Sequence, residues 1–269
     1  MIYMNDIKIS VIMGIYNCAD TLGEAVDSIL NQTYDKWELI MCDDASTDET
    51  IEVANEYCKK DKRIKLIKND INMGLAYSLN KCLSIAKGEY IARHDGDDIC
   101  LPKRFEKQIK FIEENDIDLL GTAVEYFDKE GTWGEHKLKM YPDKNDVFKE
   151  SMFSHPTILI KKSLIQSVEG YTVSNITLRA EDYDLFAKLY SKGVKGSNLQ
   201  EVLLRVRRDK DAYKRRKFKY RIDESRCKFN AWKMLNINIK YLPIVLLPII
   251  KGIVPVEIVK RYHNVKFSN

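Results

Sequence analysis

Residues 90–98, Tyr-Ile-Ala-Arg-His-Asp-Gly-Asp-Asp, run from a short apolar strand directly into three carboxylates and a glycine. Carboxylates gathered at a strand end repel one another unless a positive group lies between them, and hard divalent cations take oxygen ligands. In an extended segment Asp95 and Asp97 point the same way, because side chains alternate along a strand. Gly96 would let a phosphate or a sugar approach the backbone. The segment therefore indicates a metal-held diphosphate, with an acidic surface turn as the alternative, because Asp and Gly are also ordinary turn residues.

Strands and helices alternate on both sides of this segment. Apolar, β-rich runs predict strands at 7–15, 37–42, 64–68, 89–94, 118–127 and 157–160. Helical spacing predicts helices at 19–30, 49–60 and 74–86, from Pro102 onward, and from residue 181 onward. Repeated βα units predict a parallel sheet with helices on both faces, and ligands bind beyond the carboxyl ends of such strands. Tyr16-Asn17, Asp43-Asp44 and 95–98 each follow a strand, so we expect them to line one cleft.

Composition and motifs exclude several classes of protein. The 269 residues, 45% hydrophobic and 31% charged, suit one large domain with an appendage or two small domains. No Gly-x-Gly-x-x-Gly follows the first strand and no P-loop motif occurs, which argues against both types of nucleotide site. The six cysteines have no Cys-x-x-Cys spacing, which argues against a zinc site and for a reducing cytosol. No apolar run of 18 residues and no signal-peptide pattern occur, so we expect neither a transmembrane helix nor secretion.

Charged residues near the predicted cleft each have a second interpretation. Glu181 and Asp182 lie in the first turn of a predicted helix, where the helix dipole favours negative charge, so they are either caps or catalytic groups. Arg93 and Arg179 each either offset the charge of a diphosphate or pair with a neighbouring carboxylate. His94 is interpreted as a packed histidine, and His155 either faces the cleft or satisfies a backbone group.

Composition changes after residue 204. Residues 205–221 hold ten Lys and Arg against two Asp, residues 212–235 predict a helix, and Tyr241–Ile250 is apolar but too short to span a bilayer. This order is typical of a segment that docks on an anionic membrane surface. The alternatives are a helical tail that closes the core and a dimer contact. Nucleic-acid binding is not expected, because the net charge is only +4 and no nucleic-acid motif appears.

Taken together, these motifs resemble those of inverting, family-two glycosyltransferases of the bacterial surface-polysaccharide kind. The resembling stretches are Ser10–Asn17, Ser28–Tyr34, Asp43–Asp48, Asn72–Leu75, Gly88–Asp98 and Glu181–Leu185. They span roughly residues 7–190 in the family order, although the family usually has proline where Gly14 or Ile15 stands. The resemblance implies a GT-A fold, which is a Rossmann-like α/β domain with a mostly parallel sheet flanked by helices. We expect this catalytic domain over residues 1–205 and a basic, amphipathic helical extension over residues 206–269.

The same resemblance implies the ligands and the roles of individual residues. It implies a nucleotide-diphosphate sugar donor, a UDP-sugar in particular, and Mn²⁺ or Mg²⁺ as the cofactor. Tyr16 would flank the nucleobase, and Asp44 would accept a hydrogen bond from a base N–H. Asp95 would contact the ribose, and Asp97 would ligate the metal. Asp182 matches the position of the general base. Supporting positions fall to Asp43, Asp98 and Glu181.

The implied reaction is metal-dependent transfer of a sugar, with inversion, to a hydroxyl of a glycan or lipid-linked acceptor in surface-polysaccharide synthesis. We expect one sugar per encounter, because the Gln-x-x-Arg-Trp motif of processive synthases is absent. One alternative is a sugar nucleotidyltransferase, although its Gly-rich, lysine-bearing first loop is missing here. The other is a non-catalytic subunit that keeps the nucleotide-sugar site. The expected location is the cytoplasm, at the inner face of the cell membrane.

Overall fold

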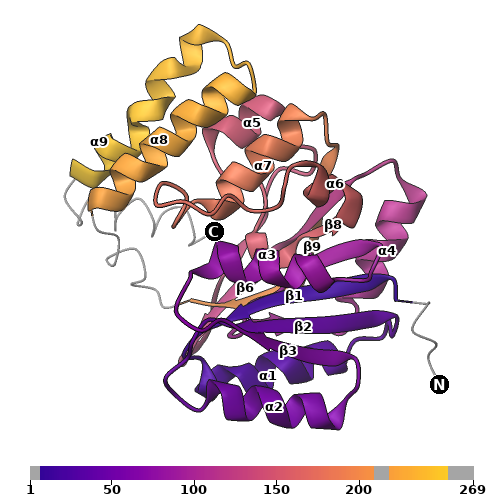
Figure 1. Ribbon diagram of the computed structural model, residues 1–269. Coiled ribbons are helices and arrows are strands. Elements are labelled where there is room, and N and C mark those ends of the chain that lie inside the picture. The colour runs from indigo at the N-terminus through magenta and orange to yellow at the C-terminus, as the bar shows by residue number, and fades with distance from the viewer. Residues whose placement is uncertain (1–6, 209–217, 254–269) are drawn as a thin grey trace.

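The computed structural model describes residues 7–208 and 218–253, which form a central sheet flanked by helices (Figure 1). The strands are β1 (Ile9–Ile15), β2 (Trp37–Asp43), β3 (Ile64–Lys68), β4 (Tyr90–Arg93), β5 (Ile99–Cys100), β6 (Leu119–Asp128), β7 (Gly131–His136), β8 (Leu159–Lys161) and β9 (Gly196–Arg207). Within these residues the strand order is β3-β2-β1-β4-β8-β6-β9-β5, and β7 pairs with β6.

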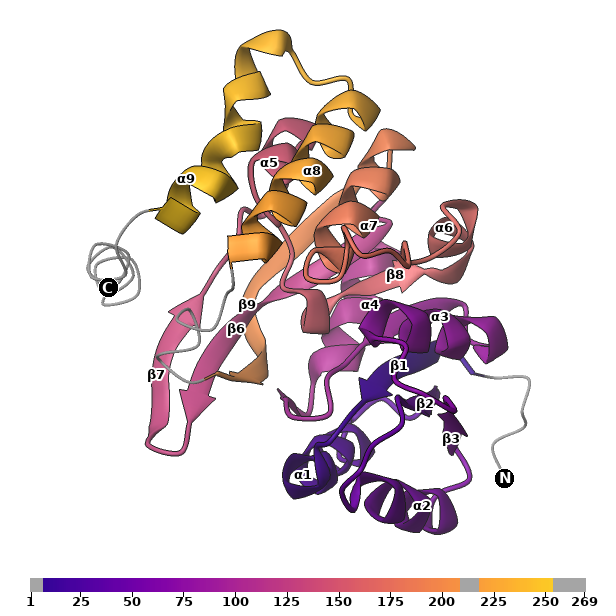
Figure 2. The ribbon, with the colours of Figure 1, turned by 60° about the vertical axis from the view of Figure 1, so that its left-hand side comes forward.

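The N-terminal half is the parallel βα arrangement that the sequence predicts. Strands β3, β2, β1 and β4 are parallel neighbours. All seven residues of β2 are buried and β1 is buried at six of seven, as in a strand covered on both faces. Helices α1 (Ala19–Leu30) and α2 (Thr50–Lys60) cover one face and α3 (Leu75–Ile85) covers the other (Figure 2).

Two hydrophobic clusters lie on opposite faces of this sheet. The alternate β1 residues Val11 and Met13 pack in one cluster together with α1, α2 and α4 (Arg104–Glu114). Ile12 packs in the other cluster with α3, α6 (Lys162–Ser167) and α7 (Glu181–Ser191). Successive residues of β1 therefore pack against the helices on opposite faces of the sheet.

The second half makes the sheet mixed. Strand β8 inserts antiparallel between β4 and β6, while β9 runs parallel to β6 and antiparallel to β5. Strands β6 and β7 form a long hairpin that extends from the body of the sheet (Figure 2). The predicted strands at 118–127 and 157–160 correspond to β6 and β8, whereas β5, β7 and β9 were not predicted.

The C-terminal helices pack against helices of the second half of the chain. Helix α8 (Phe218–Met234) contacts α7 and α5 (Lys144–Lys149), and Tyr183 and Ala187 meet Cys227 and Ala231 in a third hydrophobic cluster. The chain continues as a 3₁₀ segment, η3 (Ile239–Leu246), and α9 (Leu247–Ile253). Helix α8 thus closes part of the core, which agrees with one interpretation of this segment. The first residues of the predicted helix, 212–217, lie outside the described part of the chain. Within that part, no helix combines the length and apolarity that crossing a bilayer requires.

Candidate active site

The carboxyl ends of β1, β2 and β4 meet at one edge of the sheet, and the polar turns that follow them line adjoining cavities. One cavity, of about 450 Å³, has Tyr16, Asp95 and Asp97 in its wall. Another, of about 350 Å³, shares Tyr16 and adds Asp44 and Glu181. The structure therefore brings together residues from three strand ends and from the start of α7, which is the convergence that the parallel sheet predicts.

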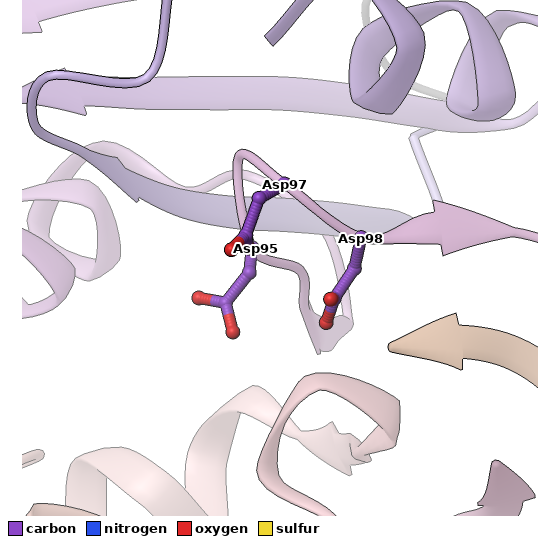
Figure 3. Close-up of side chains that lie close together, drawn as sticks. All are labelled: Asp95, Asp97 and Asp98. Carbon is purple, nitrogen blue, oxygen red and sulfur yellow. The ribbon is translucent and has the colours of Figure 1, made fainter. Parts of the chain in front are cut away.

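Three carboxylates of the turn between β4 and β5 come from a single loop and lie on the same side of it (Figure 3). One oxygen from each of Asp95, Asp97 and Asp98 lies within 4.8 Å of the others. Burial, and then the charge of Asp95, raise the pKa of Asp97 to about 6. The same causes, together with the charge of Asp97, raise the pKa of Asp98 well above its ordinary value. The ionised forms of these carboxylates therefore destabilise one another.

Two basic residues limit this charge without removing it. Arg93 is buried and forms a two-pronged ion pair with Asp95, which confirms the second of its two interpretations. The Arg207 backbone N–H donates to Asp98 Oδ1 at 3.0 Å. Asp98 Oδ2 is buried and has no hydrogen-bond partner in residues 7–208 and 218–253. An oxygen-rich cluster with an unpartnered buried oxygen fits a hard divalent cation.

Gly96 has a packing role in this turn. A Cβ atom built on Gly96 would lie 3.0 Å from Cys18 Sγ and 3.2 Å from Ile15 Cγ2. The Thr21 hydroxyl donates to the Gly96 carbonyl at 3.0 Å. The missing side chain thus lets the acidic turn lie against the end of β1, which positions Asp95 and Asp97 beside Tyr16.

The carboxylate of Asp44 organises the loop before α3. Its Oδ1 accepts hydrogen bonds from Asn69 Nδ2 and the Met73 N–H, and its Oδ2 accepts one from the Gly74 N–H, each at 2.8 Å. A carboxylate has about four acceptor positions, so one remains for a ligand. The neighbouring Asp43 accepts from the Ser46 N–H at 3.2 Å and supports the same turn.

The first two residues of α7 line different cavities. Glu181 lies in the cavity that holds Tyr16 and Asp44, and burial together with the charge of Asp182 raises its pKa to about 7. Asp182 lies in a smaller cavity, where Ser151 Oγ donates to its Oδ2 at 3.4 Å. Its Oδ1 accepts from the Tyr183 N–H at 2.7 Å, a bond that holds the carboxylate at the helix start. Asp182 thus lies both in the first turn of α7 and in the wall of a cavity.

Comparison with known proteins identifies the family. Residues 10–177 match the model of the family described as Glycosyl transferase family 2. The chain belongs to glycosyl transferase family 2. It is 43% identical over 264 residues to EpsE of Bacillus subtilis (strain 168), whose name assigns it to the glycosyltransferases, with 97% of this chain and 95% of EpsE covered. It is 31% identical over 230 residues to WfaP of Escherichia coli, with 86% and 87% of the two chains covered. WfaP is named a UDP-Glc:α-D-GlcNAc-diphosphoundecaprenol β-1,3-glucosyltransferase.

Solved structures share the fold of this family 2 glycosyltransferase. Staphylococcus aureus TarS 1–349, solved with UDP-GlcNAc, superposes with a TM-score of 0.69 at 18% identity, covering 90% of this chain and 79% of TarS. A mannosyltransferase of Pyrobaculum calidifontis, solved with GDP-Man and Mn²⁺, gives a TM-score of 0.63 at 18% identity and covers 90% and 69% of the two chains. The expected GT-A fold is therefore confirmed, and the chain is a glycosyltransferase.

Two histidines of this glycosyltransferase lie near the site without lining its cavities. His94 is fully buried 3.5 Å from Arg104 Nη1, and burial holds its pKa well below the ordinary value, so its interpretation as a packed histidine is confirmed. His155 Nε2 lies 2.8 Å from the Tyr171 hydroxyl. This side-chain contact matches neither of the two interpretations of His155, which were a position in the cleft and a hydrogen bond to a backbone group.

Some site residues of the glycosyltransferase were not found from the sequence. Arg207 ends a strand that no pattern predicted. Lys228 lines the cavity of Asp182 but is one lysine among many in a basic region. Ser151 and Asn69 act through single hydrogen bonds to Asp182 and Asp44. Short polar contacts of this kind leave no periodic signal in the sequence.

Proposed function

We propose that this glycosyltransferase moves a sugar from a UDP-sugar to a hydroxyl group with inversion of the anomeric centre, and that it acts in surface-polysaccharide synthesis. The observation that carries the proposal is the row of adjoining cavities. Tyr16 and the acidic turn line the first, Tyr16 and Glu181 line the second, and Asp182 lines the third. Such a row provides a place for a nucleotide diphosphate and, beside it, a carboxylate for an attacking hydroxyl.

The donor would occupy the two larger cavities. Tyr16 is 49% exposed at the end of β1 and offers a ring face to a nucleobase. The remaining acceptor position of Asp44 suits an N–H donor such as that of uracil. Asp95 would accept from the ribose, held in place by Arg93. TarS was solved with UDP-GlcNAc, and the name of WfaP specifies UDP-Glc. Both support a uridine-diphosphate donor.

Asp97, supported by Asp98, would hold Mn²⁺ or Mg²⁺, which supplies Lewis-acid neutralisation of the charge on the leaving diphosphate. The carboxylates fit this role because Asp97 and Asp98 lie close together and, among the residues that the structure describes, neither forms an ion pair like that of Asp95 with Arg93. The mannosyltransferase solved with Mn²⁺ supports the choice of metal.

Asp182 would act as the general base. A carboxylate within reach of the acceptor hydroxyl removes its proton as the oxygen attacks the anomeric carbon, and such a base contributes about 10²–10⁴-fold to the rate. Direct displacement with a single base inverts the configuration. Glu181 borders the donor cavity and would orient the sugar.

A transfer assay tests the proposal. The full-length protein is incubated with a panel of nucleotide sugars and Mn²⁺, with a short-alkyl glycoside as acceptor and with no acceptor. We expect UDP release from one UDP-sugar that is faster with acceptor, and an inverted product by NMR. Release of pyrophosphate from a sugar phosphate and UTP would instead identify a nucleotidyltransferase. Donor binding without turnover under every condition would identify a non-catalytic subunit.

We infer that residues 206–269 form an extension that docks the catalytic domain, residues 1–205, on the anionic inner face of the cell membrane. The support is the exposed apolar strip of Leu246, Leu247, Ile250 and Ile253 beside a basic sequence. Part of that basic sequence, including Arg215, lies outside the described residues.

Replacing Leu246 and Leu247 by Ser should reduce flotation with both anionic and neutral vesicles, because insertion of apolar side chains does not depend on lipid charge. Replacing Arg215, Arg216 and Lys217 by Glu should reduce only binding to anionic vesicles, an effect that salt screens. Unchanged flotation of both variants would assign the extension to packing alone.

A further inference from the structure

The cavity that contains Asp182 has a basic lining that the donor site does not explain. It measures about 170 Å³ and lies between the start of α7, the end of α5, α8 and the start of α9. Four cationic side chains border it, namely Lys149, Arg179, Lys228 and Lys251. Arg179 also borders the cavity of Tyr16 and Glu181, so this basic cavity adjoins the donor side.

Lys228 is the buried member of this group. It is 6% exposed, and its Nζ donates to the Phe148 carbonyl at 3.1 Å and to the Lys149 carbonyl at 2.7 Å. Its Nζ also lies 4.7 Å from the ring centroid of Tyr183. An ammonium group has three donors, so one remains after the two bonds to the end of α5. No ion pair of Lys228 occurs in the part of the chain that the structure describes.

The other three cations are exposed at the rim of the cavity. Lys149, Arg179 and Lys251 also form no ion pair within residues 7–208 and 218–253. Three carboxylates border the cavity as well: Glu150, Asp182 and Glu224. Arg221 Nη1, from outside the lining, pairs with Glu224 at 3.2 Å. The lining therefore keeps an excess of positive charge, and a buried cation with a free donor suits an anionic ligand.

An apolar surface begins at the edge of this cavity. Leu247 and Pro248 line the cavity itself, and the neighbouring Leu246, Ile250 and Ile253 are 54%, 52% and 72% exposed. The same place thus offers cationic donors, a carboxylate proposed as the base, and an apolar strip. A ligand with an anionic group between a sugar and a long hydrocarbon chain would match all three.

We propose that the basic cavity binds the diphosphate of a polyprenyl-diphosphate-linked sugar, which is the acceptor. Lys149, Lys228 and Lys251 hold the diphosphate, the sugar hydroxyl faces Asp182, and the hydrocarbon chain leaves along α9. The inference rests on the proposed transferase activity and names the acceptor class for it. It also assigns the start of α9 to substrate recognition as well as to membrane contact.

The test compares two acceptors, of which only one carries the diphosphate group. One is N-acetylglucosaminyl diphosphate esterified to a short alkyl chain, and the other is the same sugar on a neutral alkyl ether. In the double variant Lys149→Ala/Lys251→Ala, the KM for the diphosphate acceptor should rise at least about tenfold, because charge-assisted bonds are lost. The KM for the neutral acceptor should change less than twofold. Lys228 is left intact, because its bonds to α5 are part of the fold.

A matched control and a second readout keep the outcomes apart. Lys233→Ala/Lys240→Ala removes two exposed lysines of the same extension that do not line the cavity, and should leave both KM values as in the wild type. Equal KM changes for both acceptors in the cavity variant, or no change for either, would overturn the diphosphate site while leaving the transferase activity standing. If the wild-type protein transfers to neither acceptor from any nucleotide sugar, the proposed function itself fails.

Discussion

Asp182→Asn should lower the transfer rate by at least ~10²-fold and leave the affinity for UDP and Mn²⁺ nearly unchanged. The amide keeps the size of the side chain. Its oxygen can accept from the Tyr183 N–H and its NH2 group can donate to Ser151 Oγ, but it cannot take a proton from the acceptor. The donor cavity holds Glu181 and does not hold Asp182, so donor binding is separate from the change. Steady-state kinetics and isothermal titration measure the two effects. A variant that keeps its rate, or a wild-type product of retained configuration, would contradict the single-base mechanism.

Glu181→Gln is the matched control for this variant, because it removes the adjacent carboxylate of the same helix turn. We expect a smaller loss of rate than for Asp182→Asn, together with a stability change that depends on pH. Burial raises the pKa of Glu181 from 4.5 to about 7, so the folded state holds this proton more tightly than the unfolded chain. The resulting stability is complete below about pH 4.5 and is lost as the pH rises through about 7, by roughly 2–3 kcal/mol. The quantity to measure is the melting temperature of Glu181→Gln minus that of the wild type. This difference should be roughly 5 °C larger at pH 8 than at pH 5. A greater rate loss for Glu181→Gln than for Asp182→Asn would exchange the two roles.

The part of the fold that the sequence predicted is the part with strong periodicity. Strands β1 and β2 are continuous apolar runs between amphipathic helices, so their type, bounds and parallel pairing follow from local pattern. Strand β9 contains polar and charged residues at Asn198, Gln200 and Glu201, and its long pairing with β6 depends on contacts distant in sequence. The antiparallel insertion of β8 between β4 and β6 likewise depends on tertiary contacts. A three-residue strand carries too little pattern to reveal its direction.

The candidate site divides in the same way. The acidic turn and the start of α7 were found because each follows or opens a predictable element, and a parallel sheet places such ends together. Their partners were not found, because Arg207 and Lys228 reach the site from elements whose positions only the folded chain defines. The ion pair of Arg93 with Asp95 was one of two alternatives predicted for Arg93. Residues two apart along a strand point to the same side, so the pair was possible, but the sequence alone did not require it.

Asp97→Ala should abolish transfer and remove most of the metal-dependent binding of UDP. The variant takes one oxygen donor from a cluster in which Asp95 is already engaged by Arg93, so Asp98 is left as the main carboxylate for a cation. Losing several kcal/mol of charge stabilisation at the leaving diphosphate corresponds to a rate loss of ~10³-fold or more. Isothermal titration with UDP in the presence of Mn²⁺, and again with a chelator, separates the metal-dependent part of the affinity. The wild type should lose affinity on chelation, whereas Asp97→Ala should bind equally weakly under both conditions.

The control for Asp97→Ala is Asp116→Ala, which removes an exposed carboxylate paired with Lys195. Asp116 precedes β6, at the edge of the sheet opposite the acidic turn. Its transfer rate and UDP affinity should match the wild type, which excludes a general effect of one lost negative charge. Folding of the Asp97 variant should be intact, because removal of a crowded carboxylate relieves repulsion with Asp95 and Asp98. A stable Asp97→Ala protein with wild-type turnover and undiminished response to Mn²⁺ would show that the metal is not held by Asp97. Loss of turnover with metal-dependent UDP binding retained would place Asp97 on the sugar instead.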